Sequence, residues 1–332
     1  MPMPLFPELD RPPQAARLGL RLHALARQGL WFGTSSWKYP GWLGSIYSTE
    51  RYLTRGRFSR KRFDTECLSE FALTFPTVCG DFSFYQFPSA DYWKRLFGES
   101  PATLQVALKA PEEITVAHWP SHPRYGARGD TANASFLDPG RFMRGFLDLL
   151  APYQDRVAVV ILEFGAFARS IFADGAAFSS RLDEFLTALP GGIRLAVEIR
   201  NPDFLDEPYY AVLARNGVAH VLSAWTRMPE LGVQIADDRA FTADFTVVRA
   251  LLSKGRTYEQ AVARFEPYET VQAPDPAARA ALVAISRRSL AEQRPTFVFV
   301  NNRLEGNAPS TIEAVATTLE TAAASPTAAT PA

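Results

Sequence analysis

Polar, charged and aromatic side chains follow the apolar runs of this chain, at the point where each run ends. The runs are rich in β-branched residues and apolar at successive positions, which is typical of strands buried on both faces of a parallel sheet. The side chains at or just after their ends are Ser35, Ser36, Trp37, Lys109, Glu163, Glu198, Arg200, Arg249, Asn301 and Asn302. Because an α/β barrel carries its ligand site at the carboxyl ends of its strands, we expect these side chains to converge at one mouth of a barrel.

The segment LAVEIRNPDF, residues 195–204, carries the strongest chemical signal. Glu198 and Arg200 are two residues apart, so they share one face of the predicted strand. A buried carboxylate without a partner is costly, and Glu198 therefore either pairs with Arg200 or Arg249 or acts as an acid, a base or a ligand anchor. We favour the functional role, in which Glu198→Gln lowers turnover without a loss of stability. An ion pair that only stiffens the barrel is the alternative.

Two further carboxylates, Glu163 and Asp81, are candidates for a second catalytic group. In such a crowded, partly buried site we expect raised carboxylate pKa values, which would suit acid–base catalysis. The cationic side chains of Lys109, Arg200 and Arg249 would hold an anionic group of the ligand.

Aromatic and amide side chains at the strand ends predict the remaining ligand contacts. Trp37 follows its strand directly, so we expect it to line the pocket rather than only cover the barrel. Asn301 and Asn302 both donate and accept hydrogen bonds, which suits a hydroxyl-rich or base-like ligand. Turn and capping chemistry is the alternative for Asn302, and more so for Asn307 in the turn that follows.

The four histidines do not form a recognisable metal site. His118 and His122 share one loop, but no HxH or HExxH pattern occurs. A GxSxG elbow and a phosphate-binding P-loop are also missing. We therefore predict neither a metal nor a cofactor.

Composition restricts the class of protein. The chain has 332 residues, with 35 Lys plus Arg against 35 Asp plus Glu, so it has no cationic excess for coating nucleic acid. Cys67 and Cys79 are too few for a disulfide scaffold, and we expect reduced thiols in a cytoplasmic protein. No apolar stretch reaches the roughly 18 residues of a transmembrane helix. The start, MPMPLFPELDRPP, lacks the apolar region of a signal peptide.

Strands and helices alternate along the chain, which predicts an α/β fold. The expected strands are residues 30–36, 75–85, 103–109, 157–163, 193–199, 218–223, 244–250 and 296–301. The expected helices are 14–29, 60–72, 89–97, 139–150, 176–189, 206–216, one or two within 257–292, and 309–321. Eight strands favour a single (β/α)8 TIM-barrel-like domain over an open doubly wound sheet, whose GxGxxG turn is missing. We expect an N-terminal extension with a short helix (1–30), the barrel (31–321) and a disordered tail (322–332).

Several sequence blocks resemble the YecE-like family, also known as domain of unknown function 72. They are a G-[TC]-S-x-W-x-Y-x-x-W-x-G-x-[FY]-Y block at 33–47, a K-x-P-x-x-[IL]-T block at 109–115, an A-[VI]-E-[FI]-R block at 196–200, an arginine at Arg249, and an F-x-N-N-x-x-x-G-x-A-P block at 299–309. The resemblance covers residues 31–321. It implies a TIM-barrel-like fold and brings no established reaction.

The second predicted strand departs from the family pattern. The family has T-V-E-x-N-x-[ST]-F-Y where this chain reads TVCGDFSFY, so Cys79 replaces a glutamate and Asp81 an asparagine. The position of Glu163 is more often glutamine in the family. If the family's glutamate is catalytic, this chain has lost it, or Asp81 and Glu163 have taken over its role.

Three functional hypotheses remain open. The leading one is a metal-independent hydrolase or isomerase, with a site at the barrel mouth for a phosphorylated or sugar-like small molecule. The second is nucleic-acid binding or repair, with the mouth gripping a backbone or a flipped nucleotide, which the neutral charge disfavours. The third is a non-catalytic ligand-binding protein, which the altered second strand supports.

Overall fold

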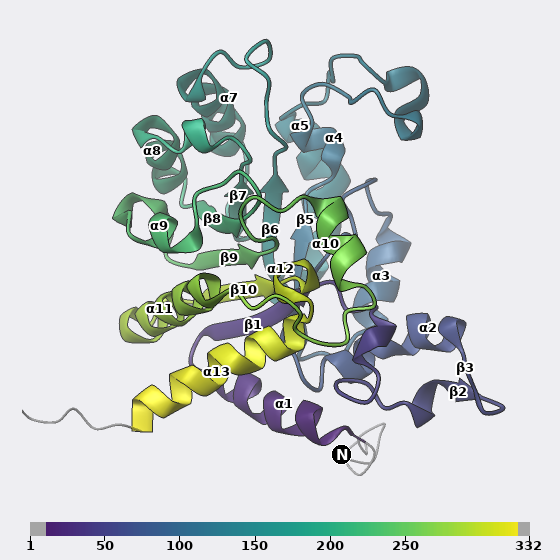
Figure 1. Cartoon of the computed structure of the whole chain (residues 1–332). Helices are drawn as coiled ribbons and strands as arrows, with labels where there is room; N and C mark the ends of the chain where they lie inside the picture. The colour runs from purple at the N-terminus through teal and green to yellow at the C-terminus, as the bar shows by residue number, and fades with distance from the viewer. Residues whose placement is uncertain (1–10, 325–332) are drawn as a thin grey trace, which may run out of the picture.

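The computed structural model describes residues 11–324, and its centre is a closed barrel of parallel strands (Figure 1). The strands are β1 (Leu30–Ser35), β4 (Thr77–Gly80), β5 (Gln105–Lys109), β6 (Val157–Glu163), β7 (Leu195–Glu198), β8 (Ala219–Ala224), β9 (Thr246–Ala250) and β10 (Thr296–Val300). Their order around the barrel is β1-β10-β9-β8-β7-β6-β5-β4, and β1 also pairs with β4. The predicted TIM-barrel-like fold is confirmed. The doubly wound alternative is wrong, because this sheet closes and leaves no edge.

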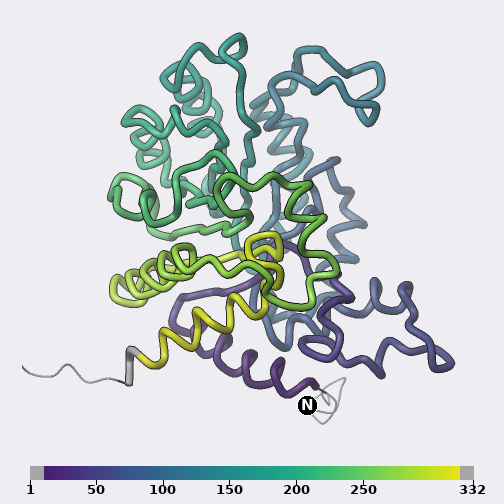
Figure 2. The backbone as a smooth tube through the Cα atoms, viewed as in Figure 1, coloured from purple at the N-terminus to yellow at the C-terminus, as the bar shows by residue number. Residues whose placement is uncertain are grey.

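Helices surround the barrel and connect its strands, as the continuous backbone trace in Figure 2 shows. They are α1 (Pro13–Ala26), α2 (Arg60–Phe71), α3 (Ala90–Glu99), α4 (Glu112–Thr115), α5 (Pro139–Phe142), α6 (Asp148–Leu150), α7 (Gly175–Thr187), α8 (Glu207–Arg215), α9 (Leu231–Ile235), α10 (Tyr258–Phe265), α11 (Pro276–Glu292), α12 (Asn302–Glu305) and α13 (Ala308–Ala324). Asp174, Asp206 and Asp275 cap α7, α8 and α11 by accepting a backbone N–H bond. Such caps fix where a helix begins after its loop.

Alternate residues of each strand point into the barrel and pack in layers. Trp31, Phe245 and Phe297 lie at the amino ends of β1, β9 and β10, and apolar side chains such as Val247 and Phe299 lie above them in the same buried cluster. A separate, larger cluster fills the space between the strands and the helices. Because side chains alternate along a strand, every second residue faces inward. These inward residues are apolar in the core and polar at the carboxyl end of the strand.

Some local expectations differ from the structure. The strand expected at 75–85 ends at Gly80, and residues 82–86 form bends that leave the sheet. A two-stranded hairpin of β2 (Leu53–Thr54) and β3 (Arg57–Phe58) was not expected. The helix expected at 139–150 contains a π-helical stretch, Met143–Leu147, between α5 and α6. The region 257–292 holds two helices, α10 and α11.

The two ends of the described chain lie on the outside of the barrel. The expected N-terminal helix is α1, which packs against β1 and α13. The last helix, α13, runs to Ala324, beyond the expected end at 321, and the rest of the expected tail lies outside the described residues. Within residues 11–324 no helix is both long and apolar enough to cross a membrane.

Candidate functional site

The inward side chains at the carboxyl ends of the strands form a polar layer at one mouth of the barrel. Going along the chain, the layer contains Ser35, Cys79, Lys109, Glu163, Glu198, Ser223, Arg249 and Asn301. Each of these residues comes two positions after another inward-facing residue of its strand. The alternation of side chains along the strand therefore places it in the layer. We call this layer, together with Trp37, Asp81, Arg200 and Trp225 from the adjoining loops, the mouth.

Arg249 connects the two glutamates of the mouth. Its Nη1 atom donates to Glu163 Oε2 at 2.5 Å and also contacts Glu198 Oε2. Arg249 is buried, and burial opposes its charge, but Glu198 and Glu163 hold its pKa well above the usual value. The guanidinium group of Arg249 is therefore a permanent positive charge within the mouth.

Arg200 closes the other side of the same network. Its Nη2 atom lies 2.7 Å from Glu198 Oε1 and 3.7 Å from Glu163 Oε1. The guanidinium carbon also lies 4.0 Å from the ring centroid of Trp225, a cation–π contact that fixes the plane of the group. The predicted proximity of Glu198, Arg200 and Arg249 is thus present.

Glu198 is fully enclosed by its partners. Its carboxylate is 0% exposed, and Ser223 Oγ donates to Oε1 at 2.8 Å in addition to the two arginines. Three donors thus surround a carboxylate that solvent does not reach. This is the geometry of a buried ion-pair network, and a role of Glu198 as an acid, a base or a ligand anchor stays a prediction.

Glu163 is the carboxylate of the network that solvent reaches, with 19% of its side chain exposed. Its Oε2 atom lies 2.9 Å from Lys109 Nζ, and Lys109 Nζ lies 2.7 Å from Asp81 Oδ1. Asp81 is more open still, at 49% exposure. Lys109 therefore sits between two carboxylates that both face the outside of the barrel mouth.

The expected rise in carboxylate pKa is wrong for Glu163. Burial alone would raise the pKa of Glu163, but the charges of Lys109 and Arg249 outweigh it and hold this pKa well below the usual value of 4.5. Burial would likewise lower the pKa of Lys109, whereas Glu163 reverses the shift and leaves that pKa above its usual value. Glu163 is thus an anion and Lys109 a cation at neutral pH.

Trp37 lies on the mouth beside a second aromatic ring, Phe82. The two rings stack with centroids 4.8 Å apart and planes inclined by 19°. Gly80 makes this possible, because a Cβ atom there would lie 2.6 Å from the Phe82 ring and 2.9 Å from Trp37. From below, the hydroxyl of Tyr47 donates to the backbone oxygen of Trp37 and holds the loop. The predicted position of Trp37 at the mouth is therefore matched by a built platform.

The two asparagines have separate positions. Asn301 points inward, where its Oδ1 accepts from Arg303 N at 2.9 Å as the cap of α12, and its Nδ2 reaches Ser35 O at 3.4 Å. Asn302 is 1% exposed, and its Oδ1 accepts from Ala308 N at 2.8 Å. The Nδ2 atom of Asn302 is buried and has no hydrogen-bond partner among the described residues, so its role in ligand binding stays a prediction.

Cys79 occupies the layer where the resemblance places a glutamate. It is 1% exposed, and burial raises the pKa of its thiol to about 11. The thiol is therefore neutral and adds no acid, base or thiolate nucleophile to the mouth. The carboxylates that face solvent come instead from Asp81 and Glu163.

Several buried polar atoms at the mouth have no hydrogen-bond partner within residues 11–324. They are Ser35 Oγ, Trp37 Nε1, Arg200 Nη1 and Arg249 Nε. A buried donor without a partner costs about 1–3 kcal/mol, so these atoms indicate where a bound molecule would offer acceptor oxygens.

Sequence reasoning missed Ser223, Trp225 and Phe82. The run VLSAW has the same form as the other strand ends, since polar Ser223 follows apolar residues and Trp225 comes two positions later. That signal could have identified both residues. Phe82 carried no such signal, because only the bend after Gly80 brings its ring onto Trp37.

The histidines of the long loop after β5 do not gather around a metal position. His122 Nδ1 accepts from Arg124 N at 3.2 Å, and the backbone of His118 forms a bridge with that of Ala132. Across residues 11–324, no three His, Cys, Asp or Glu side chains are grouped so that they could hold a metal ion.

Comparison with known proteins places the chain in one family. The family described as "Protein of unknown function DUF72" matches residues 31–332. A DUF72 family protein from Thermotoga maritima has a similar structure, with a TM-score of 0.56 and 17% identity over 89% of this chain and 99% of that one. A DUF72 family protein from Enterococcus faecalis has a TM-score of 0.54 and 13% identity over 90% and 96% of the two chains. No curated protein matches the sequence. The chain is therefore a member of the DUF72 family, with the TIM-barrel-like fold that its blocks at 33–47 and 299–309 predicted.

Proposed function

We propose that the mouth binds a neutral, hydroxyl-rich small molecule of the sugar type and does metal-independent acid–base chemistry on it. The observation that carries the proposal is the arrangement of Asp81, Lys109 and Glu163, an ammonium group between two solvent-facing carboxylates. Such a row offers acceptors and a donor side by side. Each hydroxyl of a sugar both donates and accepts, so it can use both kinds of group.

The charge pairing narrows the ligand class that the sequence left open. Lys109, Arg200 and Arg249 had been assigned to an anionic group, but each is paired with a carboxylate of the mouth. A phosphate would have to compete with those carboxylates and would be repelled by them. A neutral polyol meets no such opposition.

The aromatic platform supports the same ligand class. The stacked rings of Trp37 and Phe82 lie beside the mouth, and the apolar face of a sugar ring packs well on such a surface. The unpartnered N–H groups of Trp37 and Arg200 would donate to its oxygens. A pocket with apolar walls and a few convergent polar groups is the usual form of a small-molecule site.

The two exposed carboxylates suit different chemical roles. Glu163 is held ionised by Lys109 and Arg249, so it would stabilise positive charge that develops on the ligand or act as a nucleophile. Asp81 has one ionic contact, to Lys109, and is the more exposed group, so it would transfer protons. Both hydrolysis and isomerisation can use such a pair.

A ligand-binding role without turnover is the second candidate. It is favoured by the ion pairs of Lys109, which already engage both solvent-facing carboxylates, Asp81 and Glu163, in the ligand-free protein. The nucleic-acid hypothesis assigned the mouth arginines to a phosphate backbone. Their ion pairs with Glu198 and Glu163 make them poor candidates for that role.

Calorimetric titration with a panel of neutral mono- and disaccharides and the matching sugar phosphates tests the proposal. We expect binding of at least one neutral sugar, weaker binding of its phosphate, and a loss of affinity of about tenfold or more in Glu163→Gln and Asp81→Asn. Glu184→Gln, which alters the exposed pair Arg181–Glu184, is the control. Preferential binding of phosphates, or unchanged affinity in both mouth variants, would refute the proposal. Product analysis then separates an enzyme from a binder.

A further inference from the structure

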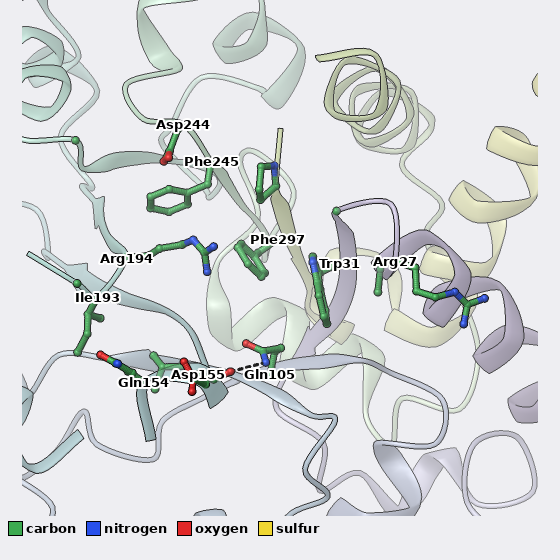
Figure 3. Close-up of a pocket in the computed structure, with 16 residues that line it drawn as sticks. Arg27, Trp31, Gln105, Gln154, Asp155, Ile193, Arg194, Asp244, Phe245 and Phe297 are labelled. Carbon is green, nitrogen blue, oxygen red and sulfur yellow. Dashed lines mark hydrogen bonds between the residues drawn. The ribbon is translucent and has the colours of Figure 1, made fainter. Parts of the chain in front are cut away.

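The amino-terminal end of the barrel, opposite the mouth, is hollowed into a cavity of about 880 Å³ (Figure 3). This volume lies within the range of about 300–1,000 Å³ that is usual for small-molecule sites. Its lining comes from the first residues of several strands and from the turns that precede them. The apolar core of the barrel, with Val247 and Phe299, separates it from the mouth.

The floor of this cavity is aromatic. Trp31 and Phe297 are stacked with centroids 6.1 Å apart and planes inclined by 27°. Phe245 continues the floor, and the guanidinium carbon of Arg194 lies 5.8 Å from the ring centroids of both Phe245 and Phe297. Figure 3 shows the Arg194 side chain directed between these two rings, toward the centre of the cavity.

Arg194 has no ion-pair partner among residues 11–324, although two acids line the same cavity. Asp155 and Asp244 are at its rim, and neither lies within ion-pair distance of a cation in the described chain. An unpaired guanidinium on an aromatic floor recognises an anionic group attached to a flat ring, because it can pair with the first and stack with the second. The two rim acids disfavour a ligand with more than one negative charge.

The turns around the opening of the cavity contain glycines, which have no side chain to project over it. Gly29, Gly192 and Gly217 all have positive φ, and no heavy atom lies within 4 Å of a Cβ built at Gly192 or Gly217. These turns adopt a conformation that glycine tolerates best, and they place no side chain over the floor. Trp31 is half-buried and Arg194 is exposed, so both can be reached from the cavity, whereas Phe245 and Phe297, each 3% exposed, support them from within the core.

Part of the cavity wall comes from the end of the N-terminal helix. Ala26 and Arg27, at the end of α1, line the rim, whereas the match to the DUF72 family begins at residue 31. Figure 3 shows the Arg27 side chain directed away from the aromatic floor, so Arg194 is the cation that lies over it. From these contacts we propose that the amino-terminal cavity is a second ligand site, which binds a planar aromatic monoanion.

The probes are indole-3-carboxylate, indole-3-carboxamide and cyclohexanecarboxylate, which carry the ring with the charge, the ring alone and the charge alone. Titration of the full chain, followed by the indole N–H signal of Trp31 in NMR spectra, gives the affinity and the location. We expect indole-3-carboxylate to bind about tenfold more tightly than either analogue and to shift the Trp31 signal.

Arg194→Met keeps the stem of the side chain and removes its charge, so the affinity for indole-3-carboxylate should fall about tenfold or more. Arg194→Lys keeps the charge without the planar guanidinium group. Its affinity for indole-3-carboxylate should lie between those of wild type and Arg194→Met. Arg17→Met on the exposed face of α1 is the matched control and should bind like wild type. Equal affinity for the three probes, a silent Trp31 signal, or an unchanged affinity in Arg194→Met would each overturn the proposal.

Discussion

The ammonium group of Lys109 lies 2.9 Å from the carboxylate of Glu163, and this pair joins the two neighbouring strands β5 and β6 at the mouth. The same ammonium group serves Asp81, which follows β4, at 2.7 Å. One cation thus pairs with both solvent-facing carboxylates. Replacing Lys109 or either acid therefore changes the electrostatics of the whole mouth.

Replacement of Lys109 by methionine should raise the pKa of Glu163. Burial raises this pKa and the charge of Lys109 is the strongest influence that lowers it, so without Lys109 the effect of burial is opposed by the arginines alone. An NMR titration of carbon-13-labelled carboxyl groups measures the change. Lys61→Met on the exposed side of α2 is the control, and an unchanged Glu163 titration in Lys109→Met would contradict the assignment.

Acid should remove the stability that Glu163 contributes. Its folded-state pKa lies below the usual value of 4.5, so the contribution is complete above that value and is lost as the pH falls toward the folded-state pKa. The free energy of unfolding of Glu163→Gln should therefore lie below that of wild type near neutral pH, and the gap should narrow below about pH 4.5. Urea denaturation between about pH 7 and pH 3 measures both curves. A difference between the two free energies of unfolding that grows in acid would contradict this prediction.

Glu198→Gln should destabilise the protein by about 3–5 kcal/mol, because it breaks a buried network and leaves two arginines short of a carboxylate. Thermal and urea denaturation beside wild type measure the loss. Glu184→Gln in an exposed pair should change stability by no more than about 0.5 kcal/mol. A fully stable Glu198→Gln with impaired ligand turnover would support the functional role that the sequence suggested.

Tyr47→Phe should weaken the ligand platform without touching a ligand. The hydroxyl of Tyr47 donates to Trp37 O, and burial holds its pKa well above the usual value, so it remains a donor. Trp37 O keeps its bond from Tyr39 N at 2.9 Å, so removing the hydroxyl should cost the net worth of one hydrogen bond, about 0.5–1.5 kcal/mol. Sugar affinity should fall with it. Tyr153→Phe, on a ring that stacks with Phe97, is the control, and equal sugar affinity of the two variants would count against a positioning role for Tyr47.

Purified protein should contain no stoichiometric transition metal. His118 and His122 belong to one loop, and the described residues offer no group of ligands around them. Elemental analysis by mass spectrometry checks this. About one zinc, iron or manganese ion per chain would show that ligands outside the described residues, or a rearranged mouth, complete a site.

The fold was predictable because its signal is local. Each apolar run is long enough for a buried strand, and the alternation within it decides which residue faces the barrel interior. Lys109, Glu163 and Arg249 could thus be placed in one layer before any contact was known. The end of β4 at Gly80 was not predictable, because residues 81–85 continue a strand-like sequence and only the stacking of Phe82 on Trp37 takes them out of the sheet.

What the sequence by itself determined is the barrel and the set of polar side chains at its mouth, since period two and strand length are properties of short segments. Only the tertiary structure decided which charges pair. Arg249 reaches Glu163 and Glu198 across 86 and 51 residues of sequence, and those contacts bury Glu198 and keep Glu163 ionised. The balance between desolvation and Coulomb attraction depends on distances between strands, and these exist only when the barrel closes.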